Sequence, residues 1–455
     1  MENSQSETAG SFLLCDVEIT ALYQRFLECR EVRIDSRQVQ PGDLFVALQG
    51  QMDGNRFALD ALAKGARYAL VDDQAYQGHE GCLVVPNALT ALQDLARYHR
   101  RRLGIPILAL TGSNGKTTTK ELITRVLAQT RQVVATKGNY NNHIGVPLTL
   151  LSIPEGTDMA IIEMGANAQG EIAGLCRIAE PDFGLITNIG KAHLEGFGGE
   201  EGVRKGKREI YTFLMDHDRL IFYNRDEAHL GDLLGAYQPA VSYGTDDPGA
   251  DMSYHLDREE PSIHLHYRSG PGKLVGVSSP LYGVHNYRNI MTAITVGRYF
   301  GVPDHRICLA IATYSPDNNR SQIIHRNGNT WIMDAYNANP TSMAMAIRSL
   351  QRMEGANKMA ILGDMLEMGE SSGSEHQKIV DLLLNTDIQP VLVGQAFLQV
   401  DCPEVWMRFE QAGEVAAWLR KLPPAGRTIL VKGSRGIALE SAVQDWISEN
   451  ASEPA

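Results

Sequence analysis

Short apolar runs alternate with amphipathic stretches along most of the chain, a pattern that predicts repeated strand and helix units. Near the start of the chain the apolar runs lie at 44–48, 68–71 and 83–85, and the helical patterns lie at 57–64 and 89–102. These elements predict a small α/β domain. The turn-forming residues Gly104-Ile105-Pro106 predict its end, so we expect the first domain to cover residues 1–104.

The middle of the chain repeats the strand, loop and helix order more regularly. Its apolar runs lie at 107–110, 159–162, 183–187 and 220–223, and a helical pattern follows each of the first three. Repeated units of this kind predict a mostly parallel sheet. Residues 251–280 instead alternate polar and apolar positions, which predicts antiparallel strands at an edge of that sheet. A helix of about fourteen residues is expected from Tyr287.

A polar, turn-rich stretch at 315–319 predicts a linker, after which the alternation resumes. The later apolar runs lie at 331–333, 359–362, 391–393 and 428–431, between helical patterns at 341–353, 374–385, 411–421 and 437–448. The predicted fold class is therefore α/β with three domains at 1–104, 105–315 and 316–455. The first domain is small, the second holds the mostly parallel sheet with its antiparallel edge, and the third is Rossmann-like.

Composition and charge exclude several classes of protein. A length of 455 residues agrees with three domains of roughly 150 residues each. Hydrophobic residues at 43% and charged residues at 21% are ordinary values for a folded protein, and a net charge of −12 disfavours nucleic acid as a partner. No apolar run approaches the ~20 residues that span a bilayer, and residues 1–10 are polar. We therefore expect no membrane association and a cytoplasmic location.

The six cysteines are spread along the chain and form no Cys-x-x-Cys pair. They are Cys15, Cys29, Cys82, Cys176, Cys308 and Cys402. Without a secretory context, such spacing predicts reduced packing residues rather than disulfides or a zinc site.

The segment 107–119 is the most informative part of the chain, because a buried strand enters a glycine-bearing loop and leaves through a helix. The loop reads Thr111-Gly112-Ser113-Asn114-Gly115-Lys116-Thr117-Thr118. The unpaired N–H groups and the dipole of a helix N-terminus attract phosphate. Lys116 is then expected along the β- and γ-phosphates and the Thr117 hydroxyl on Mg²⁺. Leu110 stands where the common pattern has glycine; the alternative is a glycine turn with a solvated lysine.

Three further residues are candidates for metal or substrate binding. Glu163 ends a buried strand, where an acid suits Mg²⁺, although a capping or salt-bridged glutamate is the alternative. His193 also follows a strand and is either a ligand or a structural residue. Lys207 lies in a basic stretch that opens a predicted helix, and its spacing alone favours a solvated helix face.

Several segments together resemble the Mur ligases, the ATP-dependent amino acid and peptide ligases of peptidoglycan precursor synthesis. The matching segments are 111–118, 138–147, 163–166, 192–195, 283–289 and 334–340. The resemblance runs in order from about residue 31 to residue 445. Segments 318–322, 334–343, 362–369 and 432–435 resemble the members that join D-alanyl-D-alanine to UDP-N-acetylmuramoyl-tripeptide. Segments 35–37 and 41–48 resemble their uridine-nucleotide-binding first domain.

The resemblance implies a role for individual residues. Lys116 and Thr117 would hold ATP phosphates and Mg²⁺, Glu163 and His193 would complete two magnesium sites, and Lys207 would be carbamylated by CO₂. A carbamate supplies the oxygen donors that Mg²⁺ prefers, so the resemblance reverses the solvated-face interpretation of Lys207.

Other residues would contact nucleotide or substrate. Asn286 and Asn289 would lie near adenine, and Arg320 and Asp334 would contact the phosphate and ribose sides of ATP. The residues expected at the muramoyl peptide, uridine nucleotide or dipeptide are Ser36, Arg37, Asn139, Asn141, Asn142, Asn337, Lys432 and Arg435. For Lys432 and Arg435 a solvated charge pair at a strand end is the alternative, and His143 stands where members often have an acid.

The expected reaction forms an amide through an acyl phosphate. The tripeptide carboxylate attacks the γ-phosphorus of ATP, and the dipeptide amine then attacks the acyl carbon and expels phosphate. Because water would hydrolyse the acyl phosphate, the third domain of a monomer is expected to close over the second about a hinge near Pro316. The alternatives are the sister ligase that adds the third peptide residue, a folate polyglutamylating ligase, a kinase, or a nucleotide-binding scaffold.

Overall fold

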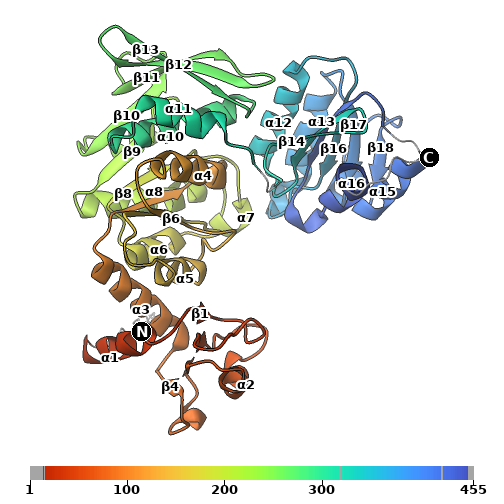
Figure 1. The fold of residues 1–455 in the computed structure, drawn as a ribbon. Coiled ribbons are helices and arrows are strands. Elements are labelled where there is room, and N and C mark those ends of the chain that lie inside the picture. Colours follow the sequence, from red (N-terminus) through yellow and green to blue (C-terminus); the bar gives the residue numbers. More distant parts are fainter. Residues whose placement is uncertain (1–13, 15, 317–318, 422–423, 449–455) are drawn as a thin grey trace, which may run out of the picture. The chain divides into compact units, whose positions relative to one another are not determined.

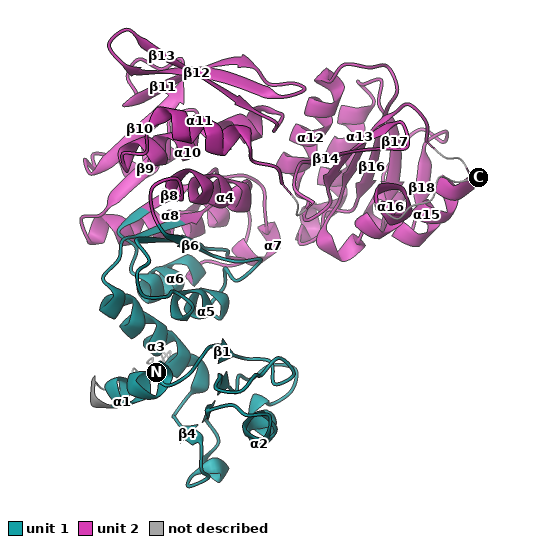
Figure 2. Cartoon of the chain, in the orientation of Figure 1, with its two compact units in different colours: residues 1–109, 132–165, 171–183 teal, residues 110–131, 166–170, 184–455 magenta. Residues whose placement is uncertain are grey.

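The computed structural model describes residue 14 and residues 16–316, 319–421 and 424–448. By contacts between residues the chain divides into two compact units (Figure 2). Unit 1 comprises residues 1–109, 132–165 and 171–183, and unit 2 comprises residues 110–131, 166–170 and 184–455. Strand β5, Ile107–Thr111, has residues in both units, and so does strand β8, Phe183–Ile186. The domain boundaries at 104 and 315 stay predictions.

Unit 1 begins with the small α/β arrangement that its sequence predicts. Four parallel strands lie in the order β1-β2-β3-β4. The strands are β1 Val32–Arg33, β2 Leu44–Val46, β3 Tyr68–Val71 and β4 Cys82–Val84. The helices are α1 Asp16–Leu27, η1 Gly54–Phe57, α2 Ala58–Ala63, η2 Gln74–Tyr76 and α3 Ala88–Leu103. The Asn87 side chain caps the start of helix α3, and Gly104 follows its last residue in the left-handed conformation. Asparagine at the amino end and glycine at the carboxyl end are both favoured helix caps.

The rest of unit 1 places an acidic residue at a strand end. Its elements are β6 Val133–Ala135, α5 Gly145–Leu151, β7 Met159–Glu163 and α6 Glu171–Ala179. Strands β6 and β7 are parallel, and every residue of β7 is buried. Glu163 is therefore the last residue of a fully buried strand, as expected from the apolar run before it.

The first part of unit 2 contains most of the predicted second domain. Its elements are α4 Lys116–Leu127, β8 Phe183–Ile186, α7 Leu194–Phe197, α8 Glu200–Asp216, β9 Leu220–Asn224, α9 Ala228–Leu234, β10 Ala240–Thr245, β11 Met252–Arg258, β12 Ile263–Gly270, β13 Lys273–Ser279, α10 Val284–Tyr299 and α11 Asp304–Ala312. Strand β10 pairs in parallel with β9 and β11, whereas β11, β12 and β13 pair antiparallel. The expected antiparallel edge is thus confirmed. Helices α10 and α4 pack together.

The second part of unit 2 is a six-stranded sheet in the order β14-β15-β19-β16-β17-β18. Figure 1 labels β14, β16, β17 and β18 among its strands. The strands are β14 Gln322–Arg326, β15 Asn329–Asp334, β16 Lys358–Gly363, β17 Gln389–Val393, β18 Met407–Phe409 and β19 Thr428–Lys432. The helices are α12 Pro340–Arg352, η3 Gly369–Ser371, α13 Ser372–Leu383, α14 Gln395–Leu398, α15 Ala412–Lys421, η4 Arg435–Ile437 and α16 Glu440–Ile447. Only the β14–β15 pair is antiparallel among the strand pairs described for this sheet.

Apolar side chains of this sheet alternate between two helical layers. Trp331, Ile361 and Val431 pack in one core with residues of α15 and α16, while α12 contacts β16 and β19. Parallel strands buried in this way leave polar residues at their carboxyl ends. Asp334 and Lys432, which end β15 and β19, are direct neighbours in the register.

The cysteines and the apolar character of the helices complete the description of the fold. The five cysteines of the described residues are free thiols, and Cys15 lies outside that part of the chain. Of the helices in the described ranges, none combines the length and apolar character needed to cross a bilayer.

Candidate functional site

The loop between β5 and α4 has the form that binds phosphate. All five residues of β5 are buried, and α4 begins at Lys116 after the left-handed Gly115. Lys116 Nζ donates to the Gly112 carbonyl at 2.7 Å and to the Ser113 carbonyl at 3.4 Å. The predicted strand, loop and helix are confirmed, and the loop leads into the N–H groups of the first helical turn, which attract anions.

The segment after β8 anchors this loop through a set of hydrogen bonds. Ser113 Oγ donates to the Gly190 carbonyl at 3.0 Å, and the Asn114 N–H donates to Asn188 Oδ1 at 3.0 Å. The Asn114 carbonyl accepts from Thr187 Oγ1 at 2.6 Å and from Asn188 Nδ2 at 2.9 Å. Sequence reasoning missed Thr187 and Asn188. Their position directly after a buried strand is the signal that could have found them.

Both glycines of the loop lie where no side chain fits. A Cβ on Gly112, whose φ is +149°, would lie 1.9 Å from Thr187 Oγ1. A Cβ on Gly115, whose φ is +77°, would lie 2.6 Å from Asn289 Oδ1. The sequence suggested that these glycines let the backbone approach phosphate closely. The structure shows that the packing of the loop itself also requires glycine at both positions.

A chain of amide hydrogen bonds connects α4 to α10. Thr119 Oγ1 donates to Asn289 Oδ1 at 3.0 Å, and Asn289 Nδ2 donates to Asn286 Oδ1 at 3.2 Å. Asn286 Nδ2 in turn donates to the Tyr282 carbonyl at 3.0 Å. Both asparagines are buried, so each amide holds the helix that carries the phosphate loop. Their proposed contact with adenine stays a prediction.

Unit 1 brings two of its predicted residues together. Asn141 Nδ2 donates to Glu163 Oε1 at 2.9 Å, and Glu163 is buried. Asn142 Oδ1 accepts from the Gly145 N–H at 2.9 Å, at the start of α5, while Asn139 is exposed. Glu163 is therefore held at the strand end by a hydrogen bond from Asn141.

The uridine-nucleotide residues of unit 1 lie in a polar loop. Arg37 has a side chain that is 85% exposed and pairs with Asp35 at 2.8 Å. Its hydrogen bond lowers the pKa of Asp35 to about 2. The Ser36 carbonyl accepts from Lys64 Nζ at 3.2 Å. The structure thus gives Arg37 an exposed guanidinium, and its substrate contact stays a prediction.

His193 and Lys207 share an electrostatic environment with Lys116. Burial lowers the pKa of His193, the charges of Lys116 and Lys207 lower it further, and the Glu367 carboxylate opposes them. His193 Nδ1 pairs with Glu367, a residue to which the sequence assigned no role. Because the Glu367 carboxylate accepts a hydrogen bond, the neutral His193 ring carries its hydrogen on Nδ1 and keeps a lone pair on Nε2.

Lys207 is only 1% exposed and lies in the middle of α8. Its Nζ is 5.1 Å from the centre of the Phe197 ring. The interpretation of this lysine as part of a solvated helix face is therefore wrong. Lysine is almost never fully buried unless it is paired, so burial of Lys207 favours a functional role over that of a solvent-exposed surface residue.

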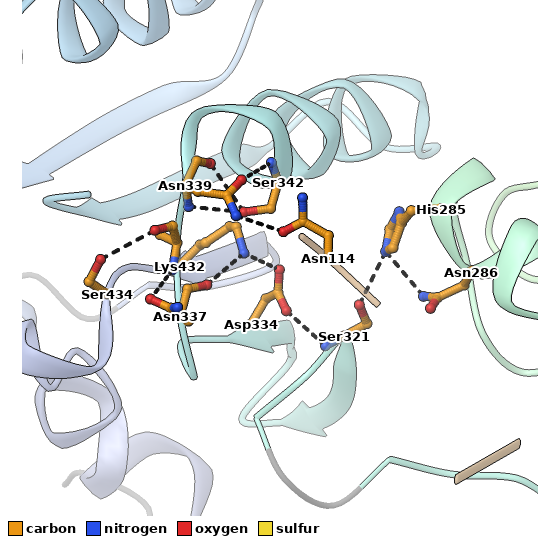
Figure 3. Close-up of polar contacts among 11 residues, drawn as sticks. Asn114, His285, Asn286, Ser321, Asp334, Asn337, Asn339, Ser342, Lys432 and Ser434 are labelled. Carbon is orange, nitrogen blue, oxygen red and sulfur yellow. Dashed lines mark hydrogen bonds and ion pairs between the residues drawn. The ribbon is translucent and has the colours of Figure 1, made fainter. Parts of the chain in front are cut away.

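Figure 3 shows Lys432 lying between Asp334 and Asn337 at the carboxyl ends of β15 and β19. Lys432 Nζ donates to Asp334 Oδ2 at 2.6 Å and to the Asn337 carbonyl at 3.1 Å. The Ser321 N–H donates to the other oxygen of Asp334 at 3.2 Å. Lys432 is 2% exposed, so the alternative of a solvated charge pair is wrong for this residue. Arg435 is exposed.

Tyr336 gathers two of the predicted arginines. The Arg320 guanidinium lies 3.8 Å and the Arg435 guanidinium 5.5 Å from the centre of its ring. Both are cation–π contacts, which hold a guanidinium while leaving its N–H donors available. The sequence did not single out Tyr336, because nothing in its local pattern indicates which cations reach it.

The amino end of α12 touches the phosphate loop directly (Figure 3). Asn339 caps α12 through Ser342, and its Nδ2 donates to Asn114 Oδ1 at 2.7 Å. Nearby, the Lys191 N–H donates to Thr341 Oγ1 at 3.3 Å, and Lys191 Nζ pairs with Glu375 at 2.9 Å. Residues of the predicted third domain therefore form part of the wall of the phosphate site.

Comparison with protein families covers most of the chain. Residues 28–111 match the "Mur ligase family, catalytic domain", residues 110–297 the "Mur ligase middle domain", and residues 319–435 the "Mur ligase, glutamate ligase domain". A UDP-N-acetylmuramoyl-tripeptide–D-alanyl-D-alanine ligase of Bacillus subtilis is 34% identical over 91% of this chain and 93% of its own length. The enzyme of that name from Escherichia coli is 33% identical over 91% and 92%.

Solved structures agree with these relatives. MurF from Acinetobacter baumannii has a TM-score of 0.83 and 29% identity, covering 94% of this chain and 98% of that one. MurF ligase from Thermotoga maritima, solved in complex with ADP, has a TM-score of 0.82 and 27% identity over 92% and 97%. The fold, the phosphate loop and these relatives lead to one conclusion: the chain belongs to the Mur ligase family.

Proposed function

We propose that this chain is an ATP-dependent ligase that joins D-alanyl-D-alanine to UDP-N-acetylmuramoyl-tripeptide, releasing ADP and phosphate, in peptidoglycan precursor synthesis. Relatives that carry this name match over nine-tenths of the chain. The observation that carries the proposal is the phosphate loop, which is anchored by Thr187 and Asn188 and contacted by Asn339. A monomer in the cytoplasm, where ATP and UDP-linked precursors are made, suits this reaction.

In the proposed mechanism the tripeptide carboxylate attacks the γ-phosphorus, and the bond to ADP breaks. Lys116 exchanges its loop carbonyl acceptors for phosphate oxygens and stabilises the charge of the transferred group. The dipeptide amine then attacks the acyl carbon, and the phosphate leaves with the former carboxylate oxygen. The charges of Lys116 and of the α4 amino end act throughout, because both lie beside the loop.

The third-domain residues complete the site and exclude water. Asn339 contacts the phosphate loop through Asn114, and the Tyr336 ring holds the guanidinium of Arg320, which we assign to the ATP phosphates. Asp334 is fixed by Lys432 and by the Ser321 N–H, as a carboxylate that binds ribose hydroxyls should be. An acyl phosphate made beneath this wall is shielded from hydrolysis.

The predicted magnesium donors are chemically suited to the ion. Thr117 offers a hydroxyl and Glu163 a carboxylate, and the lowered pKa of His193 keeps its imidazole neutral. An unmodified Lys207 does not fit, because a buried ammonium repels a cation, whereas its carbamate would be an oxygen-donor anion. Bound Mg²⁺ would neutralise charge on the phosphates.

Replacing Lys207 with alanine tests the carbamate. We expect activity to fall by at least about a hundredfold, the order seen when one transition-state contact is lost, and to recover in part with added formate or acetate. Such an acid can occupy the space of the missing carbamate oxygens. The measurement is the rate of ADP release in the presence of the muramoyl tripeptide and D-alanyl-D-alanine.

Lys205→Ala is the matched control, because Lys205 is an exposed lysine two residues earlier in α8. It should keep wild-type activity and show no response to the acids. Unchanged rates in Lys207→Ala, together with unchanged wild-type rates after removal of CO₂, would rule out the carbamate.

Replacing Asn339 with serine tests the contact between α12 and the phosphate loop. Serine keeps the helix cap but is too short to reach Asn114, so one hydrogen bond of ~1 kcal/mol is lost. We expect kcat/KM for ATP to fall by about three- to tenfold. The loss should shrink in an Asn114→Ala background, since that partner is then already missing.

Asn87→Ser is its control, because Asn87 caps α3 in the same way through the Thr90 N–H. It should leave kcat/KM for ATP unchanged. Equal effects of Asn87→Ser and Asn339→Ser would mean that helix capping alone explains the result.

A panel of amines tests the substrate assignment. Purified protein is mixed with ATP and the UDP-linked muramoyl tripeptide, and ADP release and product mass are measured. D-alanyl-D-alanine should support both, whereas glutamate, lysine and diaminopimelate should not. Turnover with one of those amino acids would favour a sister ligase, a phosphorylated product without an amide would favour a kinase, and ATP binding without turnover would favour a scaffold.

A further inference from the structure

Two histidines on the antiparallel edge of unit 2 lie together outside the residues assigned to the ligase reaction. His255 on β11 and His266 on β12 are directly opposite in the strand register (strands in Figure 1). Their ring centres are 4.8 Å apart, with 43° between the ring planes. Their side chains are 49% and 30% exposed, so the pair is open to solvent.

A carboxylate fixes each ring through the same nitrogen. His255 Nδ1 lies 2.8 Å from Asp246 Oδ1, and His266 Nδ1 lies 2.9 Å from Asp257 Oδ1. A carboxylate only accepts, so each neutral ring carries its hydrogen on Nδ1 and has a lone pair on Nε2. Hydrogen bonding of the far ring nitrogen to a carboxylate is the arrangement that orients histidines for metals.

The two Nε2 atoms are available for a shared ligand. Within the described ranges, the hydrogen bonds of both rings are made through Nδ1. Gly276, opposite His266 on β13, leaves open space where a side chain would stand. Two imidazoles that bind one tetrahedral ion have ring centres roughly 5 Å apart, which is close to the separation found here.

We infer that His255 and His266 bind one divalent transition-metal ion, such as Zn²⁺ or Cu²⁺, through their Nε2 atoms, with water in the remaining positions. Imidazole suits these metals, whereas Mg²⁺ prefers oxygen donors. The charges of Asp246 and Asp257 compensate that of the ion. Among the described residues no group of three or more His, Cys, Asp or Glu could hold a metal, so this site has two protein ligands and stays open.

His264 provides a matched control on the same strand face. It lies two residues before His266, but both of its ring nitrogens have partners. Nδ1 contacts Ser278 Oγ at 3.0 Å, and Nε2 contacts Ser262 Oγ at 3.2 Å and the Arg258 guanidinium. His264 thus has the same residue type, strand and exposed face without a free ring nitrogen.

The test is a calorimetric titration of the full chain with Zn²⁺, and separately with Cu²⁺, in excess Mg²⁺. The wild type should bind one ion more than His255→Ala and His266→Ala do, and His264→Ala should match the wild type. Asp257→Asn should weaken that site by about tenfold or more, because it removes the carboxylate behind His266. The Cu²⁺ paramagnetic resonance spectrum should show two nitrogen ligands, and one or none in the histidine variants.

Equal stoichiometry and affinity in the wild type, His255→Ala and His266→Ala would overturn the inference. Loss of the ion in His264→Ala with retention in the other two would also overturn it. The four positions are partly exposed on a sheet surface, so the variants are expected to fold, which thermal unfolding and ADP binding check. Since the proposed mechanism assigns no role to these side chains, failure of this site would leave the proposed ligase reaction untouched.

Discussion

Replacing Lys116 with alanine is expected to lower kcat/KM by about a hundred- to a thousandfold. Its ammonium is held at the loop by the Gly112 carbonyl. In the proposed mechanism it stabilises the charge that develops on the transferred phosphoryl group. Loss of one such preorganised contact raises the barrier by about 3–4 kcal/mol, and each ~1.4 kcal/mol is a factor of ten. The measurement is the steady-state rate of ADP release as a function of ATP concentration, with the muramoyl tripeptide and D-alanyl-D-alanine at saturation.

Two comparisons separate chemistry from folding in this variant. Lys116→Arg keeps the charge but changes the donor geometry, so it should recover only part of the rate. The unfolding temperature should change little, because the side chain is only partly buried. Turnover of Lys116→Ala near that of the wild type would remove this residue from the mechanism.

Replacing Gly112 with alanine is expected to abolish nucleotide binding. The added Cβ would lie 1.9 Å from Thr187 Oγ1, whose hydroxyl donates to the Asn114 carbonyl. Either the loop or the strand end must move, and φ of +149° is itself unfavourable for alanine. ADP affinity measured by calorimetry should fall below detection, and activity should fall with it.

Gly198→Ala is the matched control, because its φ is +74° and a Cβ there meets no atom within 4 Å. That variant has backbone strain without the clash, so it should bind ADP normally. In Gly112→Ala, a second change of Thr187 to alanine removes the clashing oxygen, and the remaining Cβ contact is 3.1 Å. The double variant should regain part of the ADP affinity; normal binding by Gly112→Ala alone would show that the loop tolerates a side chain.

The elements that the sequence predicted best are those with a regular apolar pattern. Strands β5 and β7 and helix α10 appear close to their predicted positions, because buried strands and long helices impose strict periods on the chain. Strand β10 was missed because Ala240–Thr245 mixes small, polar and aromatic residues without alternation. Strand β14, Gln322–Arg326, was not predicted, because it is a half-exposed hairpin partner without a continuous apolar run.

In the candidate site, features formed by neighbouring residues could be predicted from the sequence, whereas contacts between residues far apart in the chain could not. The phosphate loop could be predicted because its strand, glycines, lysine and helix are contiguous. The Asn114–Asn339 contact joins residues 225 positions apart, and the His193–Glu367 pair joins residues 174 apart. No local pattern encodes which strand ends meet, so these contacts required the fold. Burial of Lys207 and Lys432 was hidden for the same reason, since charge alone suggests solvent.

Transfer of a carboxylate oxygen to phosphate tests the central claim most directly. The tripeptide is labelled with ¹⁸O in its terminal carboxylate and turned over with ATP and D-alanyl-D-alanine, and the released phosphate is examined by ³¹P resonance or mass spectrometry. An acyl phosphate formed at the loop of Lys116 predicts one labelled oxygen in each phosphate for each amide made. Amide formation with unlabelled phosphate would contradict the account.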